Sequence, residues 1–195
     1  CPPPKKEICV PRSFGKLVKT RAGVREAVAV YATRAAEKLR KQRYAAGALR
    51  VFIMTNRFRD EPQYTNSTIL EVPVPTDCTG ELIRFALRGA DSIYRDGYRF
   101  YKAGVLLTNL VPSSAVQTDL FYKRDFEGTR RLMEALDHIN ANMGPNTVKY
   151  AAAGLAQRWK TKFNHRSPRY TTRWEDLPVA LSSRRNNVVC EGVGC

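Results

Sequence analysis

The residues of this sequence best suited to chemistry are arginines and lysines set beside aromatic side chains and glycines. In Arg12-Ser13-Phe14-Gly15-Lys16, two positive charges flank backbone N–H groups that could meet a phosphate, and the same residues also fit the end of a strand with a turn glycine. A second group, Arg99 and Lys102, lies in the segment 98–107, where aromatic and basic residues alternate. Both groups suit the binding of an anion.

The charge of the whole chain favours a polyanionic partner. Lysine and arginine number 33 against 18 acidic residues, which gives a net charge of +15 and a pI of about 9.9. An excess of this size is typical of nucleic-acid binding, which we favour over binding to a membrane surface. The residues expected to contact nucleic acid are Arg12, Ser13, Phe14, Gly15, Lys16, Arg50, Arg57, Arg99 and Lys102.

Catalytic and metal chemistry have little support in the sequence. The five cysteines are odd in number and form no C-x-x-C pair, which argues against a disulfide framework and against a zinc site. A cysteine nucleophile paired with His138 or His165 is the less favoured alternative to reduced, structural thiols. The acidic residues are scattered singly or in loops, so we expect no catalytic residue, no metal and no cofactor in this chain.

The composition also bears on location. Hydrophobic residues make up 43% of the chain, enough for a real core. No run approaches the ~18 consecutive apolar residues of a membrane span, and the first residues do not resemble a signal peptide. We therefore expect a soluble, cytoplasmic protein with no membrane partner.

Hydrophobic periodicity predicts the elements that position the basic residues. One helix spans 24–43 and is stopped by Gly47, and a second runs to about Arg95 behind N-cap oxygens from Thr76, Asp77 or Thr79. The predicted strands are 8–14, 48–55, 66–74 and 98–107. In the last of these, Tyr98, Phe100 and Lys102 are expected on one face, opposite Tyr101, Ala103 and Val105.

The order strand, helix, strand, strand, helix, strand predicts an α+β, ferredoxin-like βαββαβ domain over residues 8–112. Both helices would cover one face of the sheet and leave the other open. An open face beside basic residues has two interpretations. It could stack bases, as RNA-recognition domains do, or it could follow the backbone of a duplex without reading bases.

Beyond residue 112 the composition changes. Residues 1–7 and 113–123 are expected as linkers, 124–181 as a small, mainly helical C-terminal region, and 182–195 as a flexible tail. A helix is predicted over 125–142 and a strand-and-helix piece over 147–163, which carries Trp159. Basic and aromatic residues interleave at Arg169, Tyr170, Arg173 and Trp174, which could contact nucleic acid or a protein partner.

Six blocks occur in an order that carries a family resemblance. They are Arg12-Ser13-Phe14-Gly15, residues 34–40, Tyr64-Thr65-Asn66-Ser67, Pro75-Thr76-Asp77, residues 98–105 and residues 167–174. Together they resemble the C-terminal part of UmuC-type Y-family translesion DNA polymerases, over residues 5–181. The resemblance implies that residues 8–112 are the little-finger domain, which grips primer-template duplex, and that this bacterial protein serves SOS mutagenesis and DNA damage tolerance.

The same resemblance implies partners. Gln117-Thr118-Asp119-Leu120-Phe121 resembles the motif that binds the bacterial sliding clamp, although Leu120 and Phe121 could instead tether the next helix. A UmuD-type partner and RecA are implied as well. The carboxylates of a polymerase palm have no counterpart in the sequence, so magnesium is expected only in that missing palm. A free-standing RNA-binding domain and a protein-only adaptor are the alternative functions.

Overall fold

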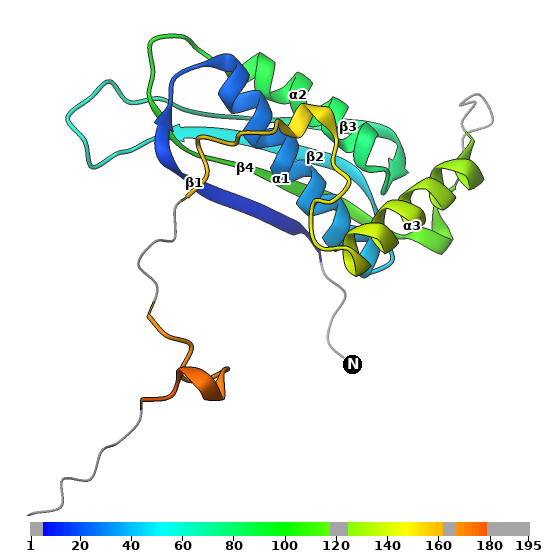
Figure 1. The fold of residues 1–195 in the computed structure, drawn as a ribbon. Helices are drawn as coiled ribbons and strands as arrows, with labels where there is room; N and C mark the ends of the chain where they lie inside the picture. The colour runs from blue at the N-terminus through cyan, green and yellow to red at the C-terminus, as the bar shows by residue number, and fades with distance from the viewer. Residues whose placement is uncertain (1–5, 118–124, 162–166, 179–195) are drawn as a thin grey trace, which may run out of the picture. The chain divides into compact units, whose positions relative to one another are not determined.

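The structure of the chain is a computed structural model, which describes residues 6–117, 125–161 and 167–178 (Figure 1). The chain divides into two compact units, Cys1–Thr161 and Lys162–Cys195. Within the described ranges, no helix is both long and apolar enough to span a membrane.

The first unit is built on a four-stranded sheet. Its elements, in chain order, are β1 (Ile8–Val18), α1 (Arg21–Lys41), β2 (Tyr44–Thr55), β3 (Thr65–Thr76), α2 (Thr79–Ile93), β4 (Phe100–Pro112) and α3 (Phe126–Asn142). The strand order is β1-β4-β2-β3 and every neighbouring pair is antiparallel. Each crossover helix therefore joins two parallel strands with one strand between them, which confirms the α+β, ferredoxin-like fold.

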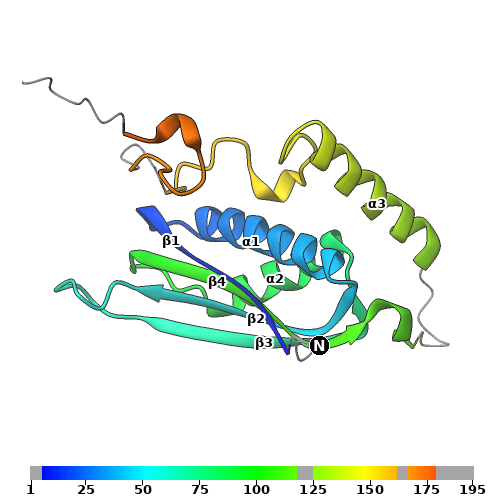
Figure 2. The ribbon, with the colours of Figure 1, turned by 90° about the horizontal axis from the view of Figure 1, so that it is seen from below.

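Both crossover helices lie on one side of the sheet, and no helix of the described chain lies on the other (Figure 2). The layer between helices and sheet is apolar, with Leu49, Val51 and Ile53 of β2 buried opposite Leu107, Val105 and Ala103 of β4. The facing side of α1 is rich in buried alanines, which let the helix approach the sheet closely. This core fixes the sheet and leaves its second face as a platform.

The start of β4 differs from the strict alternation that we expected. Phe100 pairs with Thr55 and Lys102 pairs with Met54, and the register shifts between these two pairs. The extra residue, Tyr101, is a β-bulge that turns Phe100 into the core, where it is fully buried on the same side as Ala103. The prediction that Phe100 shares a face with Lys102 was wrong, because a bulge resets the period of two.

Two predicted helix boundaries were also wrong. The helix α1 ends at Lys41, and Arg43 takes the left-handed conformation (φ 57°) at which the chain turns into β2. Gly47 instead lies inside β2, where an added Cβ would stand 2.8 Å from Asn109 Nδ2. At the start of α2 the capping position is held by Cys78, without a side-chain cap.

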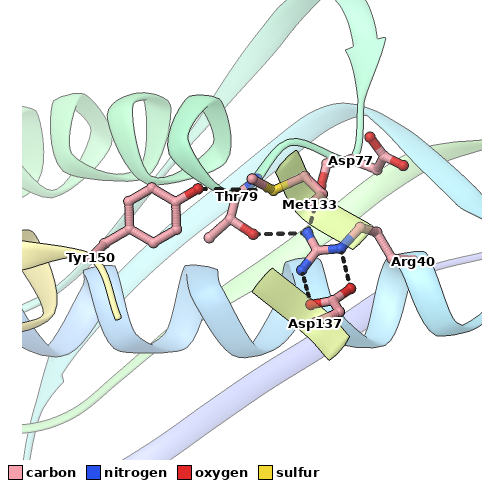
Figure 3. Close-up of polar contacts among 6 residues, drawn as sticks. All are labelled: Arg40, Asp77, Thr79, Met133, Asp137 and Tyr150. Carbon is pink, nitrogen blue, oxygen red and sulfur yellow. Dashed lines mark hydrogen bonds and ion pairs between the residues drawn. The ribbon is translucent and has the colours of Figure 1, made fainter. Parts of the chain in front are cut away.

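The helix α3 was expected and is present; it packs on the rest of the first unit through its buried Met133 and through Arg40 of α1 (Figure 3). Nε and Nη2 of Arg40 donate to the two carboxylate oxygens of Asp137, each over 2.7 Å. Its Nη1 donates to the Thr79 hydroxyl and to the Asp77 carbonyl, each over 2.8 Å. The side chain of Arg40 therefore joins α1, the start of α2 and α3.

After α3, residues 150–161 form an irregular segment that packs on β1 and α1 of the same unit. We call this segment the strap. The predicted strand-and-helix piece over 147–163 was wrong for the part that the structure describes, which has only a 3-10 turn at Ala151–Ala153. Tertiary contacts hold the strap instead. Trp159 is buried against the rings of Phe14 and Tyr31, at 6.0 and 5.6 Å, and its indole N–H donates to Glu26 over 3.0 Å.

Candidate nucleic-acid interface

The strand register identifies the side chains of the open face, because residues directly opposite one another across antiparallel strands share a face. The row Pro11–Gly104–Phe52–Ser67 crosses all four strands away from the helices. Its neighbouring rows complete the face. The residues of the three rows are Cys9, Pro11 and Ser13 of β1, Lys102, Gly104 and Leu106 of β4, Arg50, Phe52 and Met54 of β2, and Thr65, Ser67 and Ile69 of β3.

The centre of this face is apolar and level. A Cβ built on Gly104 would stand 2.4 Å from the edge of the Phe52 ring, so the ring occupies the space that a side chain at 104 would need. Pro11 closes the other side of Gly104 at 3.0 Å, and Ile69 is 64% exposed one row further along β3. A ring laid over a glycine leaves a surface that a flat or grooved partner can approach.

Basic side chains lie on the same face. Arg50 is exposed and its Nη2 donates to the Ser67 hydroxyl over 2.7 Å, which directs the guanidinium along the sheet. Lys102 lies in the row of Ser13 and Met54. Neither cation has an acidic partner among the described residues, so both charges are available to an anion. Arg50 and Lys102 are thus the sequence-predicted contacts that the sheet brings together with Ser13.

The loop between β2 and β3 places further charged residues, of both signs, at one end of the sheet. Arg57 is exposed and has no ion-pair partner within the described ranges. Arg99 immediately precedes β4, and its Nη1 approaches the Glu61 carboxylate at 3.2 Å, while Arg59 approaches the same carboxylate at 3.6 Å. The acidic residues Asp60 and Glu61 offset the charges of Arg57 and Arg59 within this loop, and Glu61 holds Arg99 against it.

The expected group from Arg12 to Lys16 is divided by the structure. Phe14 is buried in the core, and the Gly15 N–H donates to the Trp159 carbonyl over 2.9 Å. Arg12 is paired with Ala103, so its side chain leaves β1 on the helix side of the sheet edge. The Gly15 N–H is therefore not free to meet a phosphate, and nucleic-acid contact by Arg12, Ser13 and Lys16 stays a prediction.

Several residues of the open face were absent from the expected contacts. Phe52, Met54 and Ile69 are apolar and were assigned to no function, although the alternation in 48–55 places Phe52 and Met54 beside Arg50. The alternation shows which residues share a face, but only the strand order shows which strands that face contains.

The remaining sequence-predicted residues lie outside this face. Gln117 is exposed, and Thr118, Asp119, Leu120 and Phe121 lie outside the described residues. In the second unit, Trp174 is 87% exposed at the start of a 3-10 turn, and Nε of Arg173 approaches the carboxylate of Glu175 at 3.6 Å. The residues Arg169, Tyr170, Arg173 and Trp174 are all exposed.

The described residues hold no cluster of three or more His, Cys, Asp or Glu side chains arranged for a metal ion. Cys9 and Cys78 are free thiols. Burial raises the pKa of the Cys9 thiol, Glu7 adds to the rise, and Lys102 and Lys38 oppose it.

Comparison with known proteins gives two matches to family models. Residues 5–120 match the impB/mucB/samB family C-terminal domain, and residues 130–180 match a domain of unknown function, DUF4113. Among curated proteins, the chain is 41% identical over 177 residues to protein UmuC of Salmonella typhimurium, covering 90% of this chain and 42% of that protein. It is 40% identical to protein SamB of Salmonella typhimurium and 35% identical to protein MucB of Escherichia coli, over 92% of this chain and 42% of each relative.

Proposed function

The chain belongs to the impB/mucB/samB family, as a UmuC-type C-terminal part, and from this we propose that it grips primer-template DNA for an error-prone translesion DNA polymerase. It spans about two-fifths (42%) of the length of the curated relatives that it matches. The polymerase activity and its magnesium ions would belong to the palm of the longer protein. The present chain would supply the little finger, in bacterial cytoplasm, during DNA repair in the SOS response.

The observation that carries the proposal is the open sheet face, with Arg50 and Lys102 beside the level centre made by Phe52 and Gly104. Four strands spaced by about 4.8 Å set the outer strands about 14 Å apart. That is wider than the major groove of B-DNA, which is about 12 Å across, so the sheet would lie across the groove and meet both backbones. Contacts of this kind neutralise phosphates and do not distinguish one base sequence from another.

Reversal of charge on the open face tests the proposal. In Arg50→Glu/Lys102→Glu, the loss of two phosphate contacts should reduce the slope of log K against log salt by about 1.8, at about 0.9 per contact. The matched control is Arg84→Glu/Arg88→Glu, which makes the same change of net charge on α2, where both arginines flank the Phe85 ring at 5.6 and 5.7 Å. Fluorescence anisotropy with primer-template DNA at several salt concentrations measures the slopes.

Equal slopes for the two double variants would contradict the placement of DNA on this face. The same titration with single-stranded RNA addresses the first alternative function, because an RNA-binding domain would prefer that ligand. A protein-only adaptor would bind neither nucleic acid at low salt.

We also propose that Gln117 to Phe121 bind the sliding clamp. Gln117 is exposed just past the 3-10 turn Ser113–Ala115 at the end of β4, and this supports access to the first residue of the motif. Leu120 and Phe121 would be the apolar anchors, each worth about 1.5–3 kcal/mol on burial. Calorimetric titration of the Leu120→Ala/Phe121→Ala variant against the clamp should show most of the affinity lost, and unchanged binding would exclude the motif.

A UmuD-type partner and RecA remain part of the proposal through the family. The exposed residues Arg169, Tyr170, Arg173 and Trp174 are the candidates for a contact with such a partner or with DNA. Charge reversal at Arg169 and Arg173 would lower affinity for whichever ligand they meet.

A further inference from the structure

The strand β1 is an outer strand of the sheet, and its far side is only partly covered (Figure 1). It pairs with β4 alone. Towards its C-terminal end, the strap lies against it, since the Gly15 N–H donates to the Trp159 carbonyl over 2.9 Å and the Thr161 hydroxyl donates to the Ser13 carbonyl over 3.0 Å. From Ile8 to Arg12, no described segment pairs with this edge. The strap thus covers the C-terminal part of this edge and leaves the part from Ile8 to Arg12 uncovered by the described residues.

The strap contacts also show which backbone groups point outward. Because the carbonyl of Ser13 and the N–H of Gly15 face the strap, alternate residues before them face the same way. Cys9 therefore presents both its N–H and its carbonyl at the uncovered part, and Pro11 presents its carbonyl. Pro11 has no N–H, so an added strand would make one hydrogen bond fewer here. The nitrogen of Pro11 faces away from β4, and for this reason the proline does not interrupt the ladder between β1 and β4.

Positive side chains surround this stretch. Burial raises the pKa of the Tyr31 hydroxyl, and the charges of Arg12 and Arg34 oppose that rise, so both guanidinium groups lie near this ring of α1. Lys38 of α1 and Lys102 of β4 act in the same way on the thiol of Cys9, where Glu7 is the opposing charge. Among the described residues none of these four cations has an ion-pair partner. In contrast, Arg21 and Arg25 on the same helix both pair with Asp91.

We propose that the edge of β1 from Cys9 to Arg12 binds an extended, acidic segment of a partner protein, which adds to the sheet as a fifth strand. Outward N–H and carbonyl groups at the spacing of a strand match an extended polypeptide, and the main chain supplies the affinity in such complexes. The cations Arg12, Arg34 and Lys38 select for acidic side chains. The other outer strand, β3, carries Pro73, Pro75 and Glu71 and lacks this combination.

The test uses the full chain and a ten-residue peptide of alternating glutamate and valine. Amide signals in an NMR titration should shift at Cys9 and Ser13, and the affinity should fall with added salt. A second peptide, with two valines replaced by proline and the same charge, should bind at least tenfold more weakly, because it cannot extend the ladder. Equal binding of the two peptides, or no binding at millimolar peptide, would overturn the proposal.

Two variants separate the docking edge from general electrostatics. Arg34→Glu/Lys38→Glu should weaken the alternating peptide at least tenfold, whereas Arg84→Glu/Arg88→Glu, with the same change of charge on α2, should not. A melting curve checks that each variant folds. A single-stranded oligothymidylate of equal charge is the competing ligand. If it shifts the Cys9 and Ser13 amides more strongly than the peptide does, this edge binds nucleic acid and the proposal is wrong.

Discussion

The side chain of Arg40 on α1 connects three elements of the first unit, because it also bonds to Thr79 of α2 and to Asp137 of α3. Its side chain is 10% exposed and forms four hydrogen bonds, to Asp137 twice, to Asp77 and to Thr79. Burial alone would lower the pKa of the guanidinium, but the hydrogen bonds and charge of Asp137 outweigh it and raise that pKa. The group therefore stays charged, and a planar fork with five N–H donors satisfies all four bonds at once.

Replacement of this arginine should destabilise the first unit. We expect Arg40→Ala to lower the free energy of unfolding by about 2–3 kcal/mol, because the Asp77 carbonyl and the Thr79 hydroxyl lose a charged donor. Asp137→Asn should cost less, about 1 kcal/mol, since that carboxylate is 35% exposed and solvent screens the pair. Urea unfolding followed by circular dichroism gives both values.

The matched control is Arg130→Ala on the exposed side of α3. Arg130 is 65% exposed and approaches Glu127 and Glu134 at 3.2 and 3.8 Å. An exposed pair of this kind contributes about 0–1 kcal/mol. A loss at Arg40 no larger than the loss at Arg130 would show that α3 is not held by this network.

At the scale of elements, the long periodic segments could be predicted from sequence and the irregular ones could not. The stripe of Val24, Val28 and Tyr31 is enough to predict α1, because a period near 3.6 needs no knowledge of its neighbours. The bulge at Tyr101 and the strap depend on contacts between distant residues. Trp159 finds Phe14 and Glu26 across more than a hundred residues, and no local pattern marks that contact.

The same limit applies to the candidate site. Alternation placed Arg50 and Phe52 on one face correctly, but the group around Gly15 was assigned from composition. Its backbone donor is taken by a segment that sequence analysis described as a strand and helix. The open face became visible only with the strand order.

The strap should stabilise the first unit chiefly through one side chain. Trp159→Ala should lower the free energy of unfolding by about 3–5 kcal/mol, the cost of emptying a site that a buried indole fills. Trp159→Phe keeps part of the ring contact and loses the hydrogen bond to Glu26, so it should cost less. Leu155→Ala, at a strap residue that is 87% exposed, is the control and should stay within about 0.5 kcal/mol.

Amide hydrogen exchange gives a second measurement of the strap. In Trp159→Ala, exchange should become faster at Gly15, whose N–H is the donor to the strap, and remain slow at Val105 in the centre of the sheet. Unchanged protection of Gly15 would show that the strap stays docked without its indole.

At the scale of the whole molecule, the boundary between compact units does not follow the boundary between family models. The match to DUF4113 covers residues 130–180, while the first unit ends at Thr161. Most of α3 and the strap lie in that match, and they pack on α1, α2 and β1 of the preceding domain. One physical role of this part of the match is therefore to complete the core of its neighbour.

Two shortened chains test this division. A chain that ends at Thr161 should keep the melting temperature of the first unit, because the residues after it form a separate compact unit. A chain that ends at Gln117 lacks Asp137 and Trp159 and should melt at least about 5 °C lower, since about 1 kcal/mol corresponds to a few degrees for a unit of this size. Equal melting of these two chains would mean that α3 and the strap contribute nothing to the fold.

The Phe52 ring that levels the sheet over Gly104 has a consequence for movement. A helical polymer that advances past a surface is slowed wherever a protruding side chain interlocks with its groove. With the Phe52 ring over Gly104 at its midline, this surface would present no protruding side chain there, so a duplex bound as proposed would meet the same surface at each position along its axis. Gly104→Leu would place a protruding side chain there. Movement along bound DNA would then require this side chain to leave the groove at every base pair.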